Sequence, residues 1–172
     1  MTVVQESSII SRHVFLPILS MKFLKAVRLD DSDARLYAAE GGAAEDGEWV
    51  VSGGYAVCDP ATGHRRAPCH CATTFVAVNS HGRCTIAEVC DIDPAAYDGI
   101  RESLTRHFVE DLGAPSLEAA RAAAEDECAY TADLAAGFPD EVWISVDREP
   151  TADGIGERYS VFKRLMIGAH KV

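Results

Sequence analysis

The sequence predicts an α+β fold, a mostly antiparallel sheet of about five to six strands with two consecutive helices packed on one face. Strand-like segments, in which apolar and other residues alternate, occur in the first half of the chain and again near its end. Between them lie two longer segments with apolar residues at helical spacing. With 172 residues, 48% of them hydrophobic, the chain is long enough to bury a core. We therefore predict a single domain over residues 21–172.

The first expected strand covers residues 22–29, where apolar residues alternate. Residues 34–40 fit either a short strand or one turn of helix. A second strand is expected over residues 49–57. The Gly53-Gly54 pair inside it indicates a bulge or a close approach of the backbone to another segment.

Two apolar runs follow, residues 73–78 and 84–91, and the polar connection between them has the composition of a hairpin. We predict that the two runs pair around Ser80-His81. In that register the residue numbers of paired positions add up to about 161 or 162, so Cys71 lies across from Cys90 or its neighbour.

Both helices have recognisable ends. The first begins at Asp93-Pro94, because aspartate is a preferred N-cap and proline loses no needed hydrogen bond at the first helical position. The second begins with Ser116 as its cap, and Gly113 and Gly137 end the two helices. Each carries an apolar stripe. The stripes are Tyr97, Ile100, Leu104, Phe108 and Leu112 in the first helix, and Leu117, Ala120, Ala124, Cys128, Thr131 and Ala135 in the second.

The end of the chain returns to strand patterns. Alternation over residues 141–148 predicts a strand. Residues 158–167 have features of both a strand and a helix, and we favour a strand that returns beside residues 141–148. The first 20 residues differ in composition, and we expect a disordered N-terminal extension there.

The chain carries a net charge of −11, concentrated in residues 88–157. Such a surface repels phosphate backbones, so we expect no binding to nucleic acid. No apolar run is long enough to cross a bilayer, and we expect no membrane association. Residues 9–20 resemble a secretory signal only weakly, because charged residues and a proline interrupt them. We therefore expect a cytoplasmic protein with reduced cysteines.

Several short motifs resemble a family of uncharacterised small bacterial proteins over residues 21 to about 165. They are Met21-Lys22-Phe23-Leu24, Arg28-Leu29-Asp30, Gly47-Glu48-Trp49, and Gly113-Ala114-Pro115 before the Ala- and Glu-rich segment 119–127. The resemblance carries no established activity. It implies an accessory role beside a larger redox or cofactor-dependent enzyme, and it does not extend to the Cys-His-Cys sequence at residues 69–71.

Five of the six cysteines lie within residues 58–90. Thiolates and imidazoles are the ligands that zinc prefers. In the predicted hairpin, Cys84 lies six residues from Cys90, roughly 20 Å along a strand, and cannot share a site with it. The candidate zinc ligands are therefore Cys69, Cys71 and Cys90, with Cys58 or His64 as the fourth. Against this site, Cys69 and Cys71 are separated by one residue where structural zinc sites have two to four, and buried cysteines often act as small apolar groups.

Three functions are compatible with the sequence. Because no catalytic motif is present, we favour a non-catalytic accessory or interaction protein without a cofactor, acting on a protein partner or as a homodimer. The alternative is a zinc-binding module built on residues 58–90. A second alternative is a thiol enzyme with a cysteine nucleophile and His64, His70, His81 or His107 as base, but no nucleophile motif surrounds any of the cysteines.

Overall fold

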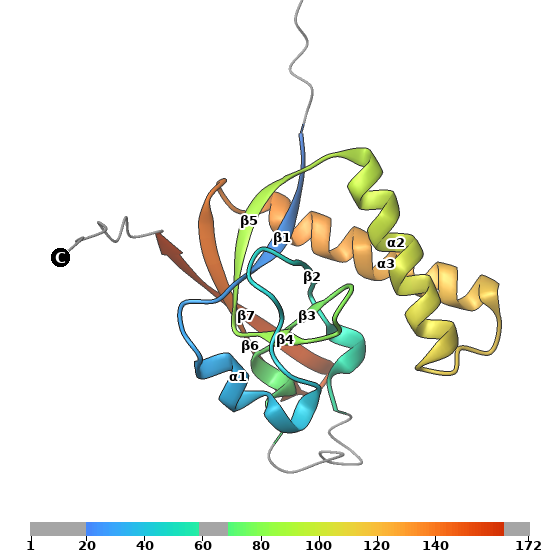
Figure 1. The fold of residues 1–172 in the computed structure, drawn as a ribbon, viewed down its shortest axis with the longest axis horizontal. Coiled ribbons are helices and arrows are strands. Elements are labelled where there is room, and N and C mark those ends of the chain that lie inside the picture. Colours follow the sequence, from blue (N-terminus) through green and yellow to red (C-terminus); the bar gives the residue numbers. More distant parts are fainter. Residues whose placement is uncertain (1–19, 59–68, 164–172) are drawn as a thin grey trace, which may run out of the picture.

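The computed structural model describes residues 20–58 and 69–163. Seven strands form one sheet in the order β4-β3-β2-β1-β5-β6-β7, and all neighbouring strands are antiparallel. The sheet curls into a half-barrel, and two consecutive helices pack against it (Figure 1). The predicted α+β class is therefore confirmed, with seven strands where five to six were expected.

The elements have the following bounds. The strands are β1 (Met21–Val27), β2 (Trp49–Val51), β3 (Phe75–Ala77), β4 (Arg83–Cys84), β5 (Ile86–Ile92), β6 (Val142–Thr151) and β7 (Gly154–Lys163). The α-helices are α1 (Ser32–Leu36), α2 (Pro94–Glu110) and α3 (Leu117–Ala136). Three 3₁₀ turns complete the fold, η1 (Ala38–Glu40), η2 (Gly54–Ala56) and η3 (Cys71–Thr73).

Both long helices begin at the predicted caps. The side chain of Asp93 accepts a hydrogen bond from the backbone N–H of Ala96 at 2.9 Å, and the Ser116 hydroxyl accepts from Ala119 at 3.1 Å. The two outermost stripe residues were predicted wrongly. Leu112 lies beyond the end of α2 and is 52% exposed, and Leu117 is the first residue of α3 and is 53% exposed.

The core has two parts, one on each face of the sheet. On the outer face, the stripes of α2 and α3 pack against residues such as Phe23, Val51 and Val76. The inside of the half-barrel is filled by the alternate residues of the same strands, including Leu24 and Val50. Since side chains alternate along a strand, β1 contributes Phe23 to one part and Leu24 to the other.

The predicted hairpin register is wrong. β3 pairs with β4 through Phe75↔Cys84 and Val76↔Arg83, and the chain then leaves this hairpin. β5 pairs instead with β1 and β6, where Cys90 lies opposite Phe23. The physical reason is a third segment. Arg83 also exchanges backbone hydrogen bonds of 2.9 Å with Gly42 and Ala44, so this segment lies along β4 as well, and only two residues of β4 pair with β3.

The other strand predictions have mixed outcomes. The strand expected over residues 49–57 ends at Val51, because Gly53 turns the chain at φ +80° into η2. The close approach predicted at the glycine pair is present, since a Cβ on Gly53 would lie 2.6 Å from Val76 Cγ2. Residues 34–40 are helical.

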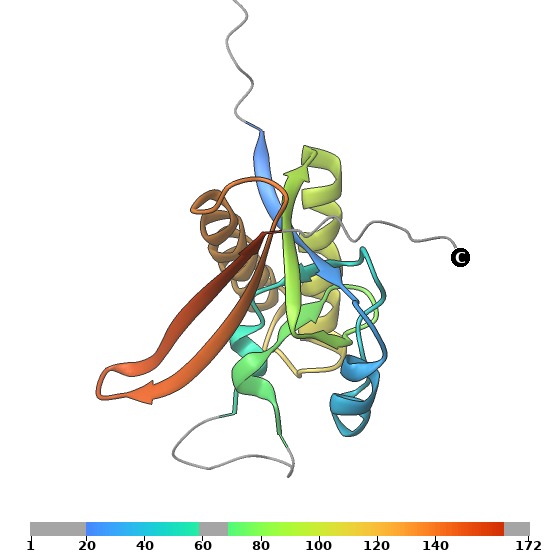
Figure 2. The same ribbon diagram turned by 90° about the vertical axis from the view of Figure 1, so that its left-hand side faces the viewer.

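The strand expected at residues 158–167 is confirmed up to residue 163. β7 pairs along its whole length with β6, and the hairpin that they form extends away from the rest of the sheet (Figure 2). The helices in the described part of the chain include none long and apolar enough to span a membrane.

Candidate metal centre

Three of the predicted ligands meet at one end of the sheet. Cys58 follows η2, and Cys69 and Cys71 lie just before and at the start of η3. One ligand atom from each of the three thiols lies within 4.8 Å of the other two. Cys58 Sγ lies 3.4 Å from Cys69 Sγ, and the backbone N–H of Cys58 donates to Cys71 Sγ at 3.4 Å.

These separations suit a tetrahedral zinc ion. Zn–S bonds of about 2.3 Å place neighbouring sulfur atoms about 3.8 Å apart. Only small shifts would therefore bring the three sulfur atoms into a first coordination shell. The arrangement supplies three protein ligands, and it could bind a metal with one position left for another ligand.

The remaining predicted ligands lie elsewhere. Cys90 is on β5, where its thiol faces the carbonyl oxygen of Phe23 at 3.9 Å, and it is not part of the three-thiol group. His64 lies outside the described residues. Cys84 and Cys128 are fully buried in the two halves of the core and act there as small apolar side chains.

The imidazole between the two neighbouring cysteines is held in place by Glu40. One oxygen of Glu40, Oε1, accepts hydrogen bonds of 2.8 Å from both the backbone N–H and the ring Nδ1 of His70. The other oxygen lies 3.5 Å from Nε of Arg83. The carboxylate side chain is only 7% exposed, so these bonds form in a dry environment where they restrain the Cys69–Cys71 backbone.

A buried guanidinium holds the other side of this segment. Arg148 comes from β6, and its side chain is 1% exposed. It donates to the carbonyl oxygens of Ser52 at 2.6 Å, Thr74 at 2.9 Å and Cys71 at 3.3 Å. Its Nε pairs with Glu157 at 2.6 Å. One side chain thus connects β6 to the backbone around η3, where Cys71 lies.

The thiols of Cys69, Cys90 and Cys128 are not tuned as nucleophiles. Burial, together with hydrogen bonds among the three thiols, raises the pKa of Cys69 to about 12. Burial likewise raises the pKa of Cys90 to about 11 and of Cys128 to about 12. A reactive cysteine needs the opposite shift. A bound metal ion reverses this effect, because a coordinating thiol loses its proton outright.

The cluster opens onto a cavity of about 410 Å³. Cys58 and Cys69 line it from one side, and Tyr55, His81 and His107 also contribute to its wall. Within the described residues, the buried Tyr55 hydroxyl and His81 Nδ1 find no hydrogen-bond partner. Burial, and next the neighbouring His107, hold the pKa of His81 below its usual value.

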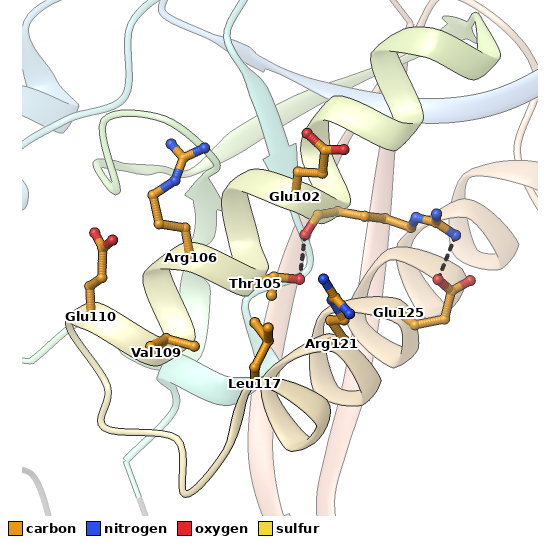
Figure 3. A pocket seen from close by; sticks show the side chains of 9 residues that line it. Glu102, Thr105, Arg106, Val109, Glu110, Leu117, Arg121 and Glu125 are labelled. Carbon is orange, nitrogen blue, oxygen red and sulfur yellow. Dashed lines mark hydrogen bonds and ion pairs between the residues drawn. The ribbon is translucent and has the colours of Figure 1, made fainter.

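A second hollow, of about 540 Å³, lies between α2 and α3 (Figure 3). Its walls carry Val109, Leu117 and several charged side chains, among them Arg101, which pairs with Glu125 at 2.6 Å. It contains no cysteine or histidine. The donor chemistry therefore favours the cavity beside the thiols as the functional site.

Comparison with known families matches residues 21–170 to a family of unknown function, DUF6505. The chain belongs to the DUF6505 family. The match begins at Met21, as the resemblance in the sequence did, and it covers all three clustered cysteines. No curated protein and no solved structure matches the chain. Membership in DUF6505 therefore carries no activity, and function has to be argued from the site.

The sequence did not reveal several residues of this site. Glu40 lies 30 residues from its partner His70, and Arg148 lies 77 residues from its partner Cys71, so no spacing rule links them to the cysteines. One feature of the sequence could have indicated a role for Arg148. It is a charged residue at a position of the alternating strand β6 that faces the core. His81 and His107 were considered only as bases for a thiol nucleophile.

Proposed function

We propose that this protein is a non-catalytic zinc-binding protein that uses Cys58, Cys69 and Cys71 as ligands. The observation that supports it best is the convergence of three thiols from two segments, with two sulfur atoms 3.4 Å apart. The hydrogen bonds of Glu40 and Arg148 to the segment around η3 support the proposal further. Ligands that are held in place before the metal binds lose less conformational entropy on binding. Since thiolate ligands require reduced cysteines, the proposal places the protein in the cytoplasm.

Zinc content and stability test this proposal. The full chain, purified with reductant, is expected to contain one zinc ion, and Cys58→Ser, Cys69→Ser and Cys71→Ser should each reduce the bound zinc strongly. Zinc added to the metal-free chain should raise the melting temperature, by a stabilisation of about 4 kcal/mol at a thousand times Kd. Cys90→Ser is the matched control and should leave zinc content unchanged. A protein without zinc that also fails to bind added zinc contradicts the proposal.

The second candidate is an accessory protein that docks on a larger enzyme. The outer edge of β7 favours it, because no other strand of the described chain pairs with that edge. Val161 and Phe162 on β7 are 50% and 45% exposed. A long, apolar edge strand is a template for pairing with another chain, and we propose an extended segment of a protein partner as its occupant.

Cross-linking distinguishes the occupants of this edge. A photo-reactive group at position 161 should capture a partner protein in cell extract, and a Val161→Lys variant should release it. Capture of a second copy of this chain, together with a dimer in analytical ultracentrifugation, would identify a homodimer instead. If the cross-linker captures neither a partner protein nor a second copy of this chain, the edge of β7 is not a docking site.

A further inference from the structure

Two histidines and an aspartate form a separate cluster beside the same cavity. His81 lies in the connection between β3 and β4, and His107 and Asp111 lie at the C-terminal end of α2. The imidazole rings of the two histidines are stacked, with centroids 3.7 Å apart and planes inclined by 16°. Nδ1 of His107 lies 2.7 Å from the Asp111 carboxylate. One ligand atom from each of the three side chains lies within 4.8 Å of the other two.

The backbone holds His81 in an unusual conformation. Its φ is +57°, in the left-handed region that residues other than glycine rarely occupy. The following Gly82 has no room for a side chain, since a Cβ there would lie 2.5 Å from the carbonyl oxygen of Ala43. The backbone of Gly82 therefore lies directly against that of Ala43, and the imidazole of His81 stacks on His107 of α2. Backbone strain of this kind is concentrated at functional sites, where the surrounding structure maintains it.

Unsatisfied polar atoms surround the cluster. Among the described residues, the buried hydroxyl of Tyr55 makes no hydrogen bond, and the buried Nδ1 of His81 makes none of normal geometry. Both residues line the cavity together with His107. Buried polar atoms without a partner are rare, and a bound ion or its water is one of the few explanations for them.

We propose that His81, His107 and Asp111 form a second metal site, which binds a divalent transition-metal ion such as Co²⁺, Ni²⁺ or Zn²⁺. Two imidazoles and one carboxylate are typical ligands of these ions, whereas Mg²⁺ and Ca²⁺ take oxygen ligands. The proposal is independent of the three-thiol site, because the two clusters share no ligand.

The geometry needs little change to accept an ion. Bonds of about 2.0–2.2 Å place neighbouring ligand atoms about 3 Å apart. His107 Nδ1 and the Asp111 carboxylate are already 2.7 Å apart, so an ion held between them takes the place of their hydrogen bond, and the neutral ring carries its single proton on Nε2. The Asp111 side chain is 56% exposed and provides the entry path, while His107 is 11% exposed. Three protein ligands leave room for a water or a substrate on the cavity side.

The simpler interpretation is a packing role for these residues. An aspartate four residues after a histidine on a helix forms an ordinary surface pair, and stacked rings bury apolar area. This interpretation explains neither the strained turn at His81 nor the unpaired atoms. It also predicts no metal binding, which makes the two interpretations separable.

Cobalt titration of a variant that lacks the thiol site is the test. The full chain carrying Cys58→Ser, Cys69→Ser and Cys71→Ser is titrated with Co²⁺, and binding is followed by calorimetry and visible absorption. We expect one equivalent to bind without a thiolate-to-cobalt charge-transfer band. Adding His81→Asn, which keeps a residue tolerant of positive φ, or Asp111→Asn should weaken binding by about 10–100-fold or more.

Matched controls separate ligation from surface charge. Glu110→Gln removes a neighbouring carboxylate of α2 and should leave Co²⁺ affinity unchanged. If the triple-serine variant does not fold, paramagnetic Co²⁺ is added to the native chain that holds one equivalent of zinc, and the ring resonances of His81 and His107 should broaden before those of His70. Failure of the folded triple-serine variant to bind Co²⁺, equal affinity in the His81→Asn variant, or no selective broadening would each overturn the proposal. None of these results bears on the three-thiol site.

Discussion

Arg148 and Cys71 lie 77 residues apart in the sequence, and Nη1 of Arg148 donates a hydrogen bond of 3.3 Å to the carbonyl oxygen of Cys71. The same guanidinium pairs with Glu157. Burial opposes ionisation of Glu157, but hydrogen bonds from Tyr130, Tyr159 and Arg148 hold its pKa below the usual value. The charges are therefore paired within the β6–β7 hairpin, and the hydrogen bond from Arg148 to Cys71 connects this hairpin to the proposed zinc site.

Replacing this arginine should be costly. Arg148→Met keeps the length of the side chain but leaves the Glu157 carboxylate without its cationic partner and several carbonyl oxygens without their donor. Breaking a buried ion pair typically costs about 3–5 kcal/mol, and we expect a loss of that size in urea unfolding, together with weaker zinc binding through the displaced η3.

Arg158→Met is the matched control. Arg158 lies on the same hairpin and pairs with Glu149 at 3.2 Å, but its side chain is 66% exposed. Exposed pairs contribute about 0–1 kcal/mol. If the two variants lose equal stability, the buried network is not what holds the hairpin to the body of the protein.

Packing of α3 leads to a second prediction. Ala124 is fully buried in the part of the core that α2, α3 and the sheet share, as its place in the stripe predicted. Ala124→Leu should overpack this contact and lower the free energy of unfolding by about 1–3 kcal/mol. Ala123 on the same helix is exposed, so Ala123→Leu should change stability by about 0.5 kcal/mol or less. An unchanged melting temperature in Ala124→Leu would contradict the packing seen here.

The success of the helix predictions and the failure of the hairpin have the same origin. The caps at Asp93 and Ser116 and the stripes between them are local signals, because each contact spans three or four residues. The β5 strand pairs with β1, whose paired residues lie 59 to 71 positions earlier in the chain (from Val27↔Ile86 to Met21↔Ile92). The local sequence of β5 does not determine which strand it pairs with, because an apolar strand can pair with any strand whose buried face matches its own.

The candidate site depended on the same wrong register. Cys58, Cys69 and Cys71 were all predicted ligands, and the residue types alone suggested zinc. Cys90 was included because the predicted hairpin placed it opposite Cys71, whereas β5 carries it to Phe23. The contacts of Glu40 and Arg148 are between segments far apart in the sequence, and neither composition nor residue spacing predicts which distant segments meet.

The proposed domain start leads to a third prediction. β1 begins at Met21, and the family match begins at the same residue. A chain that starts at Met21 should keep the circular dichroism spectrum and the melting temperature of the full chain. A chain that starts at Leu24 removes Phe23 from the core and should lose about 3–5 kcal/mol, as large core truncations do. A marked loss already in the first chain would show that residues 1–20 contribute to the fold.

Glu127 makes stability depend on pH, and this dependence is the fourth prediction. Its Oε1 accepts a hydrogen bond of 2.7 Å from the backbone N–H of Gly53, which helps the carboxylate. Burial nevertheless dominates and raises the pKa of Glu127 above its usual value. Because the folded state holds the proton more tightly than the unfolded state, stability is lost as pH rises from about 4.5 through the higher folded pKa.

Replacing Glu127 by glutamine, which has the same shape and no charge, should remove this loss of stability at higher pH. We expect Glu127→Gln to melt at a higher temperature than the parent at pH 7, since the amide can still accept from Gly53 without a buried charge. The difference should disappear below about pH 4.5, where the parent carboxyl is protonated in both states. Asp126→Asn is the control, because Asp126 is exposed and should show no such dependence. A lower melting temperature for Glu127→Gln at pH 7 would mean that the ionised carboxylate, with its bond to Gly53 and its attraction to Arg148, outweighs the cost of its burial.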